Sequence, residues 1–235
     1  MRRACLICSA LLIAITSAIA AGQETNGRAI TDAGQHAVLR RFFAIPQNSP
    51  HELTAIRRLE ARNDHFDKDA WMDVRTQEDA TGFRYEVIGE GGSPYIRSNV
   101  FRPALQTEQK MWRDGDPDRA AFTLDNYQFE DRGSEESGLV WLGVTPRRKD
   151  LLLVNGSIFL RPEDGELVRI EGALAKNPSF WTKRVEVVRR YERIAGVRLP
   201  VWMQSIATIR IAGKSTLTTT YQYLSINGQA IPQDQ

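Results

Sequence analysis

Cysteine is almost absent from the sequence, and the two that occur, Cys5 and Cys8, lie within the first 20 residues. The three histidines, at positions 36, 51 and 65, do not have the paired spacing that is typical of metal ligands. There is no GxSxG nucleophile motif, and no cysteine follows residue 8. These absences predict a protein without disulfides, without a metal site or other cofactor, and without enzymatic activity.

An excess of charge of one sign is also missing. The chain has 31 basic residues, Lys and Arg together, and 29 acidic residues. Arg2 and Arg3 are the only charged residues among the first 20, so residues 21–235 carry 29 of each sign (31 − 2 = 29 against 29). A nucleic-acid-binding domain normally has a basic excess. The balance therefore predicts no nucleic-acid partner.

Long hydrophobic runs are lacking as well. The apolar stretch from Ala4 to Ile19 is shorter than a membrane span and is followed by a polar run. Arg2 and Arg3 before it, and Ala18-Ile19-Ala20 at its end, are typical of a cleavable secretory signal peptide. The sequence predicts a signal peptide over residues 1–20, an exported mature chain that starts near Ala21, and no stable membrane insertion. An uncleaved N-terminal anchor is the alternative.

What the chain does contain is strand pattern. In "GFRYEVIGE" (82–90), Phe83, Tyr85 and Val87 fall on one face while Arg84 and Glu86 fall on the other. The links are short and polar, which favours antiparallel neighbours. The predicted strands cover residues 54–63, 70–79, 82–90, 122–131, 138–146, 150–160, 165–175, 182–194, 197–211 and 214–226.

Two segments are predicted to be helical. Residues 36–45 have helical apolar spacing and are followed by Pro46. Residues 93–113 begin with Ser93 and Pro94, an N-cap followed by proline at the first helical position. Pro103 is expected to kink or split this second helix.

The predicted fold is a single domain over residues 21–235. Leu151, Leu153 and Phe159 alternate with other apolar residues, so the strand over 150–160 must bury both faces over part of its length. With one substantial helical insertion available, the sequence predicts a mainly β (α+β) fold. A strongly curved antiparallel sheet of about ten strands, a half-open β-barrel, wraps around the central helical insertion.

Three short motifs have a chemical and a structural interpretation. "GKST" (213–216) resembles the end of a phosphate-binding loop, but Thr208 stands where that loop needs glycine, and a hairpin turn is favoured. "GEGGS" (89–93) precedes a helix and is either an anion site or a strand-to-helix turn, which is favoured. "NDHFDKD" (63–69) lacks the glycine and terminal Glu of a calcium loop, so a solvated turn is favoured.

The C-terminal part of the chain resembles a known family. "LLLVNGSIFLRPEDGELVRIEG" is a strand, an acidic turn with glycine, and a second strand. "VVRRYERIAGVRLPVWMQSIATIRIAGKSTLTTTYQYLSING" adds an Arg-Tyr strand, a turn and two long strands. This pattern over residues 151–228 is similar to the LolA-like superfamily of outer-membrane lipoprotein-sorting proteins. The resemblance implies a half-open barrel with helices across its concave side.

The same resemblance implies a function in the periplasm. It predicts a carrier that binds lipid or an acylated lipoprotein in an apolar groove. An arginine that ties the barrel to its helical lid is also implied, although the sequence assigns it to no position. A non-enzymatic sensor or interaction module of the same fold, which contacts an envelope protein, is the alternative function.

Apolar residues are predicted to line such a groove, unless they fill an ordinary core. The helical side comprises Ile96, Val100, Phe101, Leu105 and Trp112. The sheet side comprises Trp71, Met72, Tyr85, Trp202 and Met203.

Phe180 and Trp181 form an aromatic pair before the strand over 182–194. Because neighbouring residues of an extended chain point to opposite sides, we expect one in the core and one outside. Trp181 shares the register of Val185 and Val187 and is predicted to be buried. Phe180 is predicted to line the groove rim or to dock a partner. Burial of both rings as an end plug is the alternative.

Overall fold

The computed structural model describes residues 37–46, 50–114 and 119–233 of the chain. The predicted signal peptide over 1–20 and the polar leader over 21–35 lie outside these residues. The elements are α1 Ala37–Ala44, β1 Glu52–Asn63, β2 Lys68–Asp79, β3 Gly82–Gly92, α2 Pro94–Ile96, the π-helical segment η2 Arg97–Phe101, α3 Arg102–Asp114, β4 Tyr127–Ser134, β5 Val140–Pro146, β6 Val154–Leu160, β7 Leu167–Leu174, β8 Thr182–Ile194, β9 Val197–Ile209, β10 Gly213–Ile226 and β11 Gln229–Ala230.

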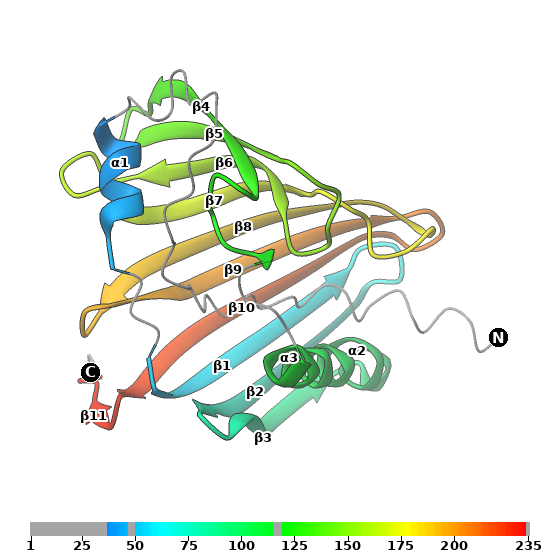
Figure 1. The fold of residues 1–235 in the computed structure, drawn as a ribbon. Coiled ribbons are helices and arrows are strands. Elements are labelled where there is room, and N and C mark those ends of the chain that lie inside the picture. The colour runs from blue at the N-terminus through cyan, green and yellow to red at the C-terminus, as the bar shows by residue number, and fades with distance from the viewer. Residues whose placement is uncertain (1–36, 47–49, 115–118, 234–235) are drawn as a thin grey trace.

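The strands form one open antiparallel sheet in the order β3-β2-β1-β10-β9-β8-β7-β6-β5-β4, with β11 paired to β10. Two meanders, β1–β3 and β4–β10, meet where β1 pairs with β10. The sheet is strongly curved (Figure 1). The fold class predicted from the sequence is therefore confirmed, with ten long strands and one short addition.

Both helical regions cover the same face of this sheet, which we call the concave face. Val38, Leu39 and Phe42 of α1 pack over β4–β8. The segment α2–η2–α3 packs over β1–β3 and β8–β10. Leu174 and Val187 contact both clusters, so the two cores are continuous across the sheet.

Strict alternation places the concave face in register from strand to strand. One row of directly opposed inward residues crosses eight strands and is apolar except for Thr219 and Arg189. We call it the concave row. Its members are Met72, Leu59, Thr219, Met203, Arg189, Ile170, Ile158 and Leu142.

Strand boundaries differ from the prediction where side chains form local turns. The strand predicted over 150–160 begins at Val154, because the Asp150 carboxylate accepts the Leu152 N–H at 3.1 Å and closes a turn. The strand predicted over 122–131 begins at Tyr127, because the backbone carbonyl of Thr123 accepts the Tyr127 N–H and closes a turn there. Part of the two-faced apolar pattern over 150–160 therefore belongs to a turn.

The insertion between β3 and β4 is helical, as predicted, but it contains a π-helical turn. The Arg102 N–H donates to the Arg97 carbonyl five residues earlier, just before Pro103. A proline ring has no N–H and collides with the carbonyl four residues before it, which a wider turn relieves. The extra residue also keeps Ile96 on the same buried side as Ala104 and Leu105. Ser93 occupies the N-cap, but its side chain makes no capping hydrogen bond, contrary to expectation.

Candidate functional site

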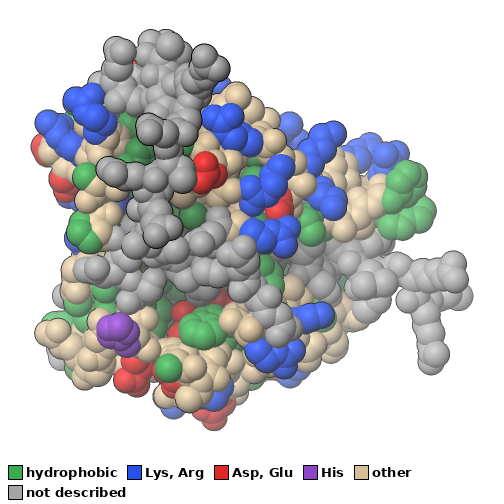
Figure 2. All heavy atoms as spheres, in the orientation of Figure 1, with side chains coloured by type: hydrophobic (Ala, Val, Ile, Leu, Met, Phe, Trp, Pro, Cys, Tyr) green, Lys and Arg blue, Asp and Glu red, His purple; other side chains and the backbone are tan. Residues whose placement is uncertain are grey.

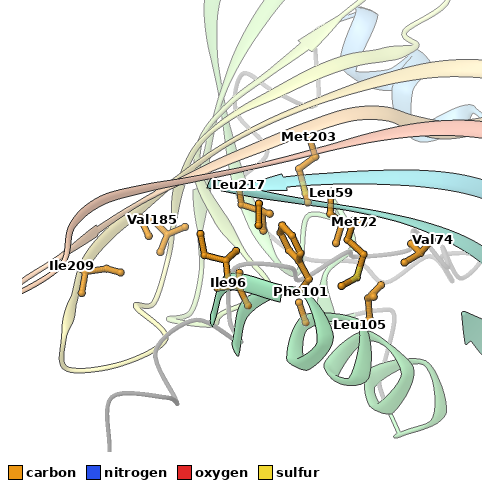
Figure 3. Packing of buried hydrophobic residues seen from close by; sticks show 14 of the residues in the cluster. Leu59, Met72, Val74, Ile96, Phe101, Leu105, Val185, Met203, Ile209 and Leu217 are labelled. Carbon is orange, nitrogen blue, oxygen red and sulfur yellow. The ribbon is translucent and has the colours of Figure 1, made fainter. Parts of the chain in front are cut away.

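The candidate site is the concave face beneath α2–η2–α3. Figure 3 shows Phe101 pointing from the helix toward Leu59, Met72 and Leu217 of the sheet. Phe101, Leu59, Met72 and Leu217 are all fully buried. This apolar contact between the helical cover and the strands lies over part of the concave row.

A buried ionic cluster lies beside the apolar contact. Arg57 of β1 is 3% exposed and donates to Glu108 of α3 at 2.7 Å and to Glu78 of β2 at 2.5 Å. Its guanidinium group lies between the rings of Phe83 and Tyr221, 5.1 and 5.2 Å from their centroids. Arg57 therefore ties the sheet to its helical cover. The sequence alone had assigned such an arginine to no position.

Burial perturbs the ionisation of this cluster. Burial raises the pKa of Glu108 to about 6, although Arg57 opposes the shift. The pKa of Glu78 is raised by burial in the same way. Burial alone would lower the pKa of Arg57, but the charges of Glu108 and Glu78 outweigh it, so that pKa lies above its ordinary value. Arg57 stays charged, whereas Glu108 can take up a proton near neutral pH.

Polar atoms without a partner among the described residues cluster at the same place. They are Oε2 of Glu108, Nε of Arg57 and Oγ1 of Thr219. Thr219 belongs to the concave row, where its direct neighbours are Leu59 and Met203. Buried polar atoms are costly unless they are hydrogen-bonded. The site thus offers donors and an acceptor within an otherwise apolar surface.

The cover has a second set of attachments along the edge of the sheet. Glu90 of β3 accepts from Arg97 at 2.8 Å and from Arg102 at 3.0 Å. The Gln109 side chain donates to the Phe83 carbonyl at 3.1 Å. The helical cover is therefore held at β3 by three polar contacts, and toward the centre of the sheet by Arg57.

The structure brings together most of the residues predicted to line the groove. Tyr85 is half-buried against the cluster, and Trp112, 37% exposed, hydrogen-bonds to Glu78 at the end of the cover. The others are buried on the concave side: Met72, Ile96, Val100, Phe101, Leu105 and Met203. Their binding of a ligand stays a prediction.

The structure corrects two predicted groove residues of the sheet. Trp71 alternates with the inward Met72, and Trp202 alternates with the inward Met203, so both face the convex side. There Arg58 stacks on Trp71 at 4.7 Å, and Arg190 stacks on Trp202 at 4.8 Å. These two tryptophans cover the outer face of the sheet under arginine side chains.

The aromatic pair before β8 is also placed differently. Phe180 is 76% exposed, as expected for a docking residue, but Trp181 is 41% exposed and not in the core. The bend of the chain at Ser179–Trp181 ends the alternation before it reaches Trp181, because regular strand geometry begins only at Thr182. Neither the split arrangement nor the end plug predicted from the sequence is present.

The described residues give little indication of other chemistry. Within residues 37–46, 50–114 and 119–233, no group of three or more His, Cys, Asp or Glu side chains could hold a metal ion. The same ranges contain no helix that is both long and apolar enough to pass through a bilayer. "GKST" starts strand β10 after a hairpin turn, as favoured from the sequence, and Asp64, His65 and Asp67 lie in an exposed turn.

Comparison with known proteins gives weak structural similarities. No family model and no curated protein matches the sequence. A solved DUF1329 family protein from Desulfovibrio piger has a TM-score of 0.40 and 11% identity, covering 79% of this chain and 90% of its own. A LolA superfamily protein from Nitrosomonas europaea has a TM-score of 0.38 and 12% identity, covering 83% and 94%. Function therefore has to be inferred from the residues of this chain.

Proposed function

We propose that this protein is an exported periplasmic carrier that holds the acyl chains of a lipid or lipoprotein between its concave face and α2–η2–α3. The observation that carries the proposal is the combination of an apolar floor with a cover that is fastened by polar contacts. Phe101 and Leu105 lie on the floor residues Leu59 and Met72. The cover can lift without leaving the protein, because its contacts with Glu90 are at the edge.

An acyl chain suits the surface that lifting would expose. Each buried methylene contributes about 0.8 kcal/mol, so an apolar floor binds a chain through area alone. In this proposal the acyl chain replaces the side chains of Phe101 and Leu105 against the concave row. The Arg57–Glu108 contact breaks, while the contacts at β3 act as a hinge.

The unpartnered polar atoms suit the other part of a lipid. The ester or amide carbonyl beside an acyl chain accepts hydrogen bonds, and the Thr219 hydroxyl and Arg57 Nε are donors without a described partner. A carbonyl placed there would satisfy a buried donor while its chain follows the concave row. Thr219 is therefore the residue that we expect to select a lipid over a plain hydrocarbon.

Lipid extraction tests the proposal most directly. The mature protein, purified from a periplasmic extract, would be extracted with organic solvent and analysed by mass spectrometry, with a parallel displacement assay that uses a fluorescent fatty acid. We expect co-purified lipid and saturable displacement. A lipid-free protein that fails to bind the probe would contradict the carrier. If that protein instead captures one envelope protein, the sensor or interaction module is supported.

A matched pair of variants tests the polar contact. Thr219→Val keeps the shape of the side chain but removes the hydroxyl, whereas Thr220→Val makes the same change on the convex face. Loss of one hydrogen bond costs about 1 kcal/mol, or roughly a fivefold loss of fatty-acid affinity. We expect this loss for Thr219→Val only. Equal affinities of the two variants would remove Thr219 from the binding site.

Export is tested separately from binding. N-terminal sequencing of the protein from a periplasmic extract should give a start near Ala21, as the signal-peptide pattern predicts. An intact Met1, or recovery of the protein in the membrane fraction only, would contradict the predicted cleavage.

A further inference from the structure

Exposed hydrophobic side chains gather at one end of the sheet. Of the eight large hydrophobic residues that are exposed within residues 37–46, 50–114 and 119–233, four lie on three of the loops there. Phe66 is on the β1–β2 turn, Phe180 and Trp181 are on the β7–β8 connection, and Ile211 is on the β9–β10 turn. We call these four residues the apolar end. The tips of the β1–β2 and β9–β10 hairpins lie side by side there (Figure 1), and Figure 2 shows hydrophobic atoms at this end beside Lys and Arg.

Hydrogen bonds hold the three loops together. The Arg210 N–H donates to the Trp181 carbonyl at 2.9 Å, and its Nε donates to the Phe180 carbonyl at 3.2 Å. The Arg210 guanidinium also stacks on the Phe180 ring at 4.9 Å. Asn63 at the end of β1 donates to the Ala212 carbonyl at 2.9 Å. The rings are therefore presented in a fixed arrangement, although they are exposed.

Two of these three loops are basic. Residues 176–184 and 210–214 contain five basic residues and no acidic residue, in a chain that has nearly equal numbers of each. All five are exposed: Lys176, Lys183, Arg184, Arg210 and Lys214. Glu186 pairs with Arg184, and the two acids of the β1–β2 turn pair with Arg62, so the surrounding acids are partly neutralised.

We propose that the apolar end is a peripheral docking site for an anionic lipid bilayer. Aromatic rings lie favourably at the level of lipid headgroups, while Lys and Arg extend along them to reach the phosphates. Anionic headgroups complement the five basic side chains. The four apolar side chains protrude from three loops, a geometry that suits a soft, deformable surface. Docking here would bring the nearby concave site to the membrane without inserting a helix.

Vesicle co-sedimentation tests this docking. We expect the mature protein to bind vesicles of phosphatidylcholine mixed with phosphatidylglycerol, and to be released by salt, but not to bind phosphatidylcholine alone. The triple variant Phe180→Ser/Trp181→Ser/Ile211→Ser should bind the anionic vesicles roughly tenfold more weakly. The control Phe43→Ser/Ile88→Ser changes exposed hydrophobic residues away from these loops, on α1 and β3, and should bind like the unmodified protein.

Charge variants separate the contribution of the basic side chains to vesicle binding from that of the apolar side chains. Lys183→Gln/Lys214→Gln should weaken binding at low salt, whereas Arg75→Gln/Lys110→Gln, which removes two exposed basic side chains on β2 and α3, should not. Far-UV circular dichroism and thermal melting confirm that each variant is folded. Fatty-acid displacement should be unchanged in the triple variant, so loss of docking is distinguishable from loss of the groove.

Three outcomes would overturn the proposal. The first is no binding of the unmodified protein to anionic vesicles. The second is an equal loss of binding in the triple variant and in the Phe43→Ser/Ile88→Ser control. The third is concentration-dependent self-association that the triple variant abolishes without any change in vesicle binding, which would assign the apolar end to contacts between copies of this chain.

Discussion

Arg57 is a charged residue in an apolar register. It lies on the inward face of β1 between Ala55 and Leu59, and its partners come from four other elements, α3, β2, β3 and β10. Replacing one member of a buried ion pair leaves its partner uncompensated, which is usually strongly destabilising. The stability of the cover and that of the sheet therefore both depend on the Arg57 side chain.

Arg57→Ala tests this dependence. We expect a loss of about 3–5 kcal/mol in the free energy of unfolding, because Glu108 and Glu78 remain buried. The matched variant Arg58→Ala, one residue further on the convex face, removes an exposed pair with Asp73 and should cost less than about 1 kcal/mol. Urea unfolding of both variants measures the difference. Similar losses in the two variants would mean that the buried ionic cluster contributes little to the free energy of unfolding.

Glu108 gives the protein a pH dependence of known sign. Its pKa is raised by burial from 4.5 to about 6, so the folded protein binds this proton more tightly than the unfolded chain. Its contribution to stability is therefore largest below pH 4.5 and declines as the pH rises through about 6. Glu78, with its pKa also raised, acts in the same direction.

Glu108→Gln isolates this effect from the other carboxylates. The stability of the unmodified protein relative to the variant should fall by about 2 kcal/mol between acidic and neutral pH. Urea unfolding across that range measures it. A difference that does not change with pH would show that Glu108 has an ordinary pKa.

The exposure of Phe180 and Trp181 sets the loss of stability that we expect when either is replaced by alanine. Trp181→Ala and Phe180→Ala should each cost less than about 1 kcal/mol, because both rings are exposed. Phe101→Ala, at a fully buried site, should cost about 3–5 kcal/mol. Urea melts of the three variants compare them. A large loss of stability for Trp181→Ala would indicate that Trp181 is buried, as the sequence predicted.

These residues also show what a sequence can reveal about side-chain placement. Alternation alone would have placed Trp71 and Met72 on different faces of the sheet. The sequence prediction grouped them by apolar character instead, and so assigned both to one face. The same alternation could have singled out Arg57, since it shares the inward register of Leu59. Its pairing with Glu108, 51 residues away, leaves no local pattern and needed the tertiary structure.

At the scale of elements, the sequence predicted most strands well and the helical cover in outline. The range of β8, 182–194, agrees with the prediction because a turn bounds the strand on each side. The boundaries of β4 and β6 depend on turns closed by Thr123 and Asp150, which hydrophobic periodicity does not detect. Pro103 correctly marked an irregular helix, although proline alone does not specify a π turn.

The attachments of the cover predict how it moves. Hydrogen exchange over residues 97–113 should be faster than over β8 and β9, because the cover opens about Glu90 while the sheet stays paired. Adding fatty acid should slow exchange in the cover. Glu90→Ala, which releases both arginines, should speed exchange further. Equally slow exchange in cover and sheet, unaffected by fatty acid, would contradict a movable cover.

At the scale of the whole molecule, the two apolar clusters beneath the helical regions share one sheet. Because Leu174 and Val187 contact both clusters, we expect the two halves to unfold together. Tryptophans lie in both halves, at Trp71 and Trp141, so their fluorescence samples each one. Unfolding curves from fluorescence and from far-UV circular dichroism should coincide. Separate transitions would show that the halves are independent.

The pairing of β1 with β10 also governs the order in which the molecule can form. These strands are separated by about 150 residues of chain, and closing so long a loop is slow compared with forming hairpins. The β4–β10 meander and the β1–β3 meander can each assemble from local contacts. The floor beneath the cover, however, combines residues of β1 and β2 with residues of β9 and β10. We therefore expect the candidate site to form last, when the two meanders have paired.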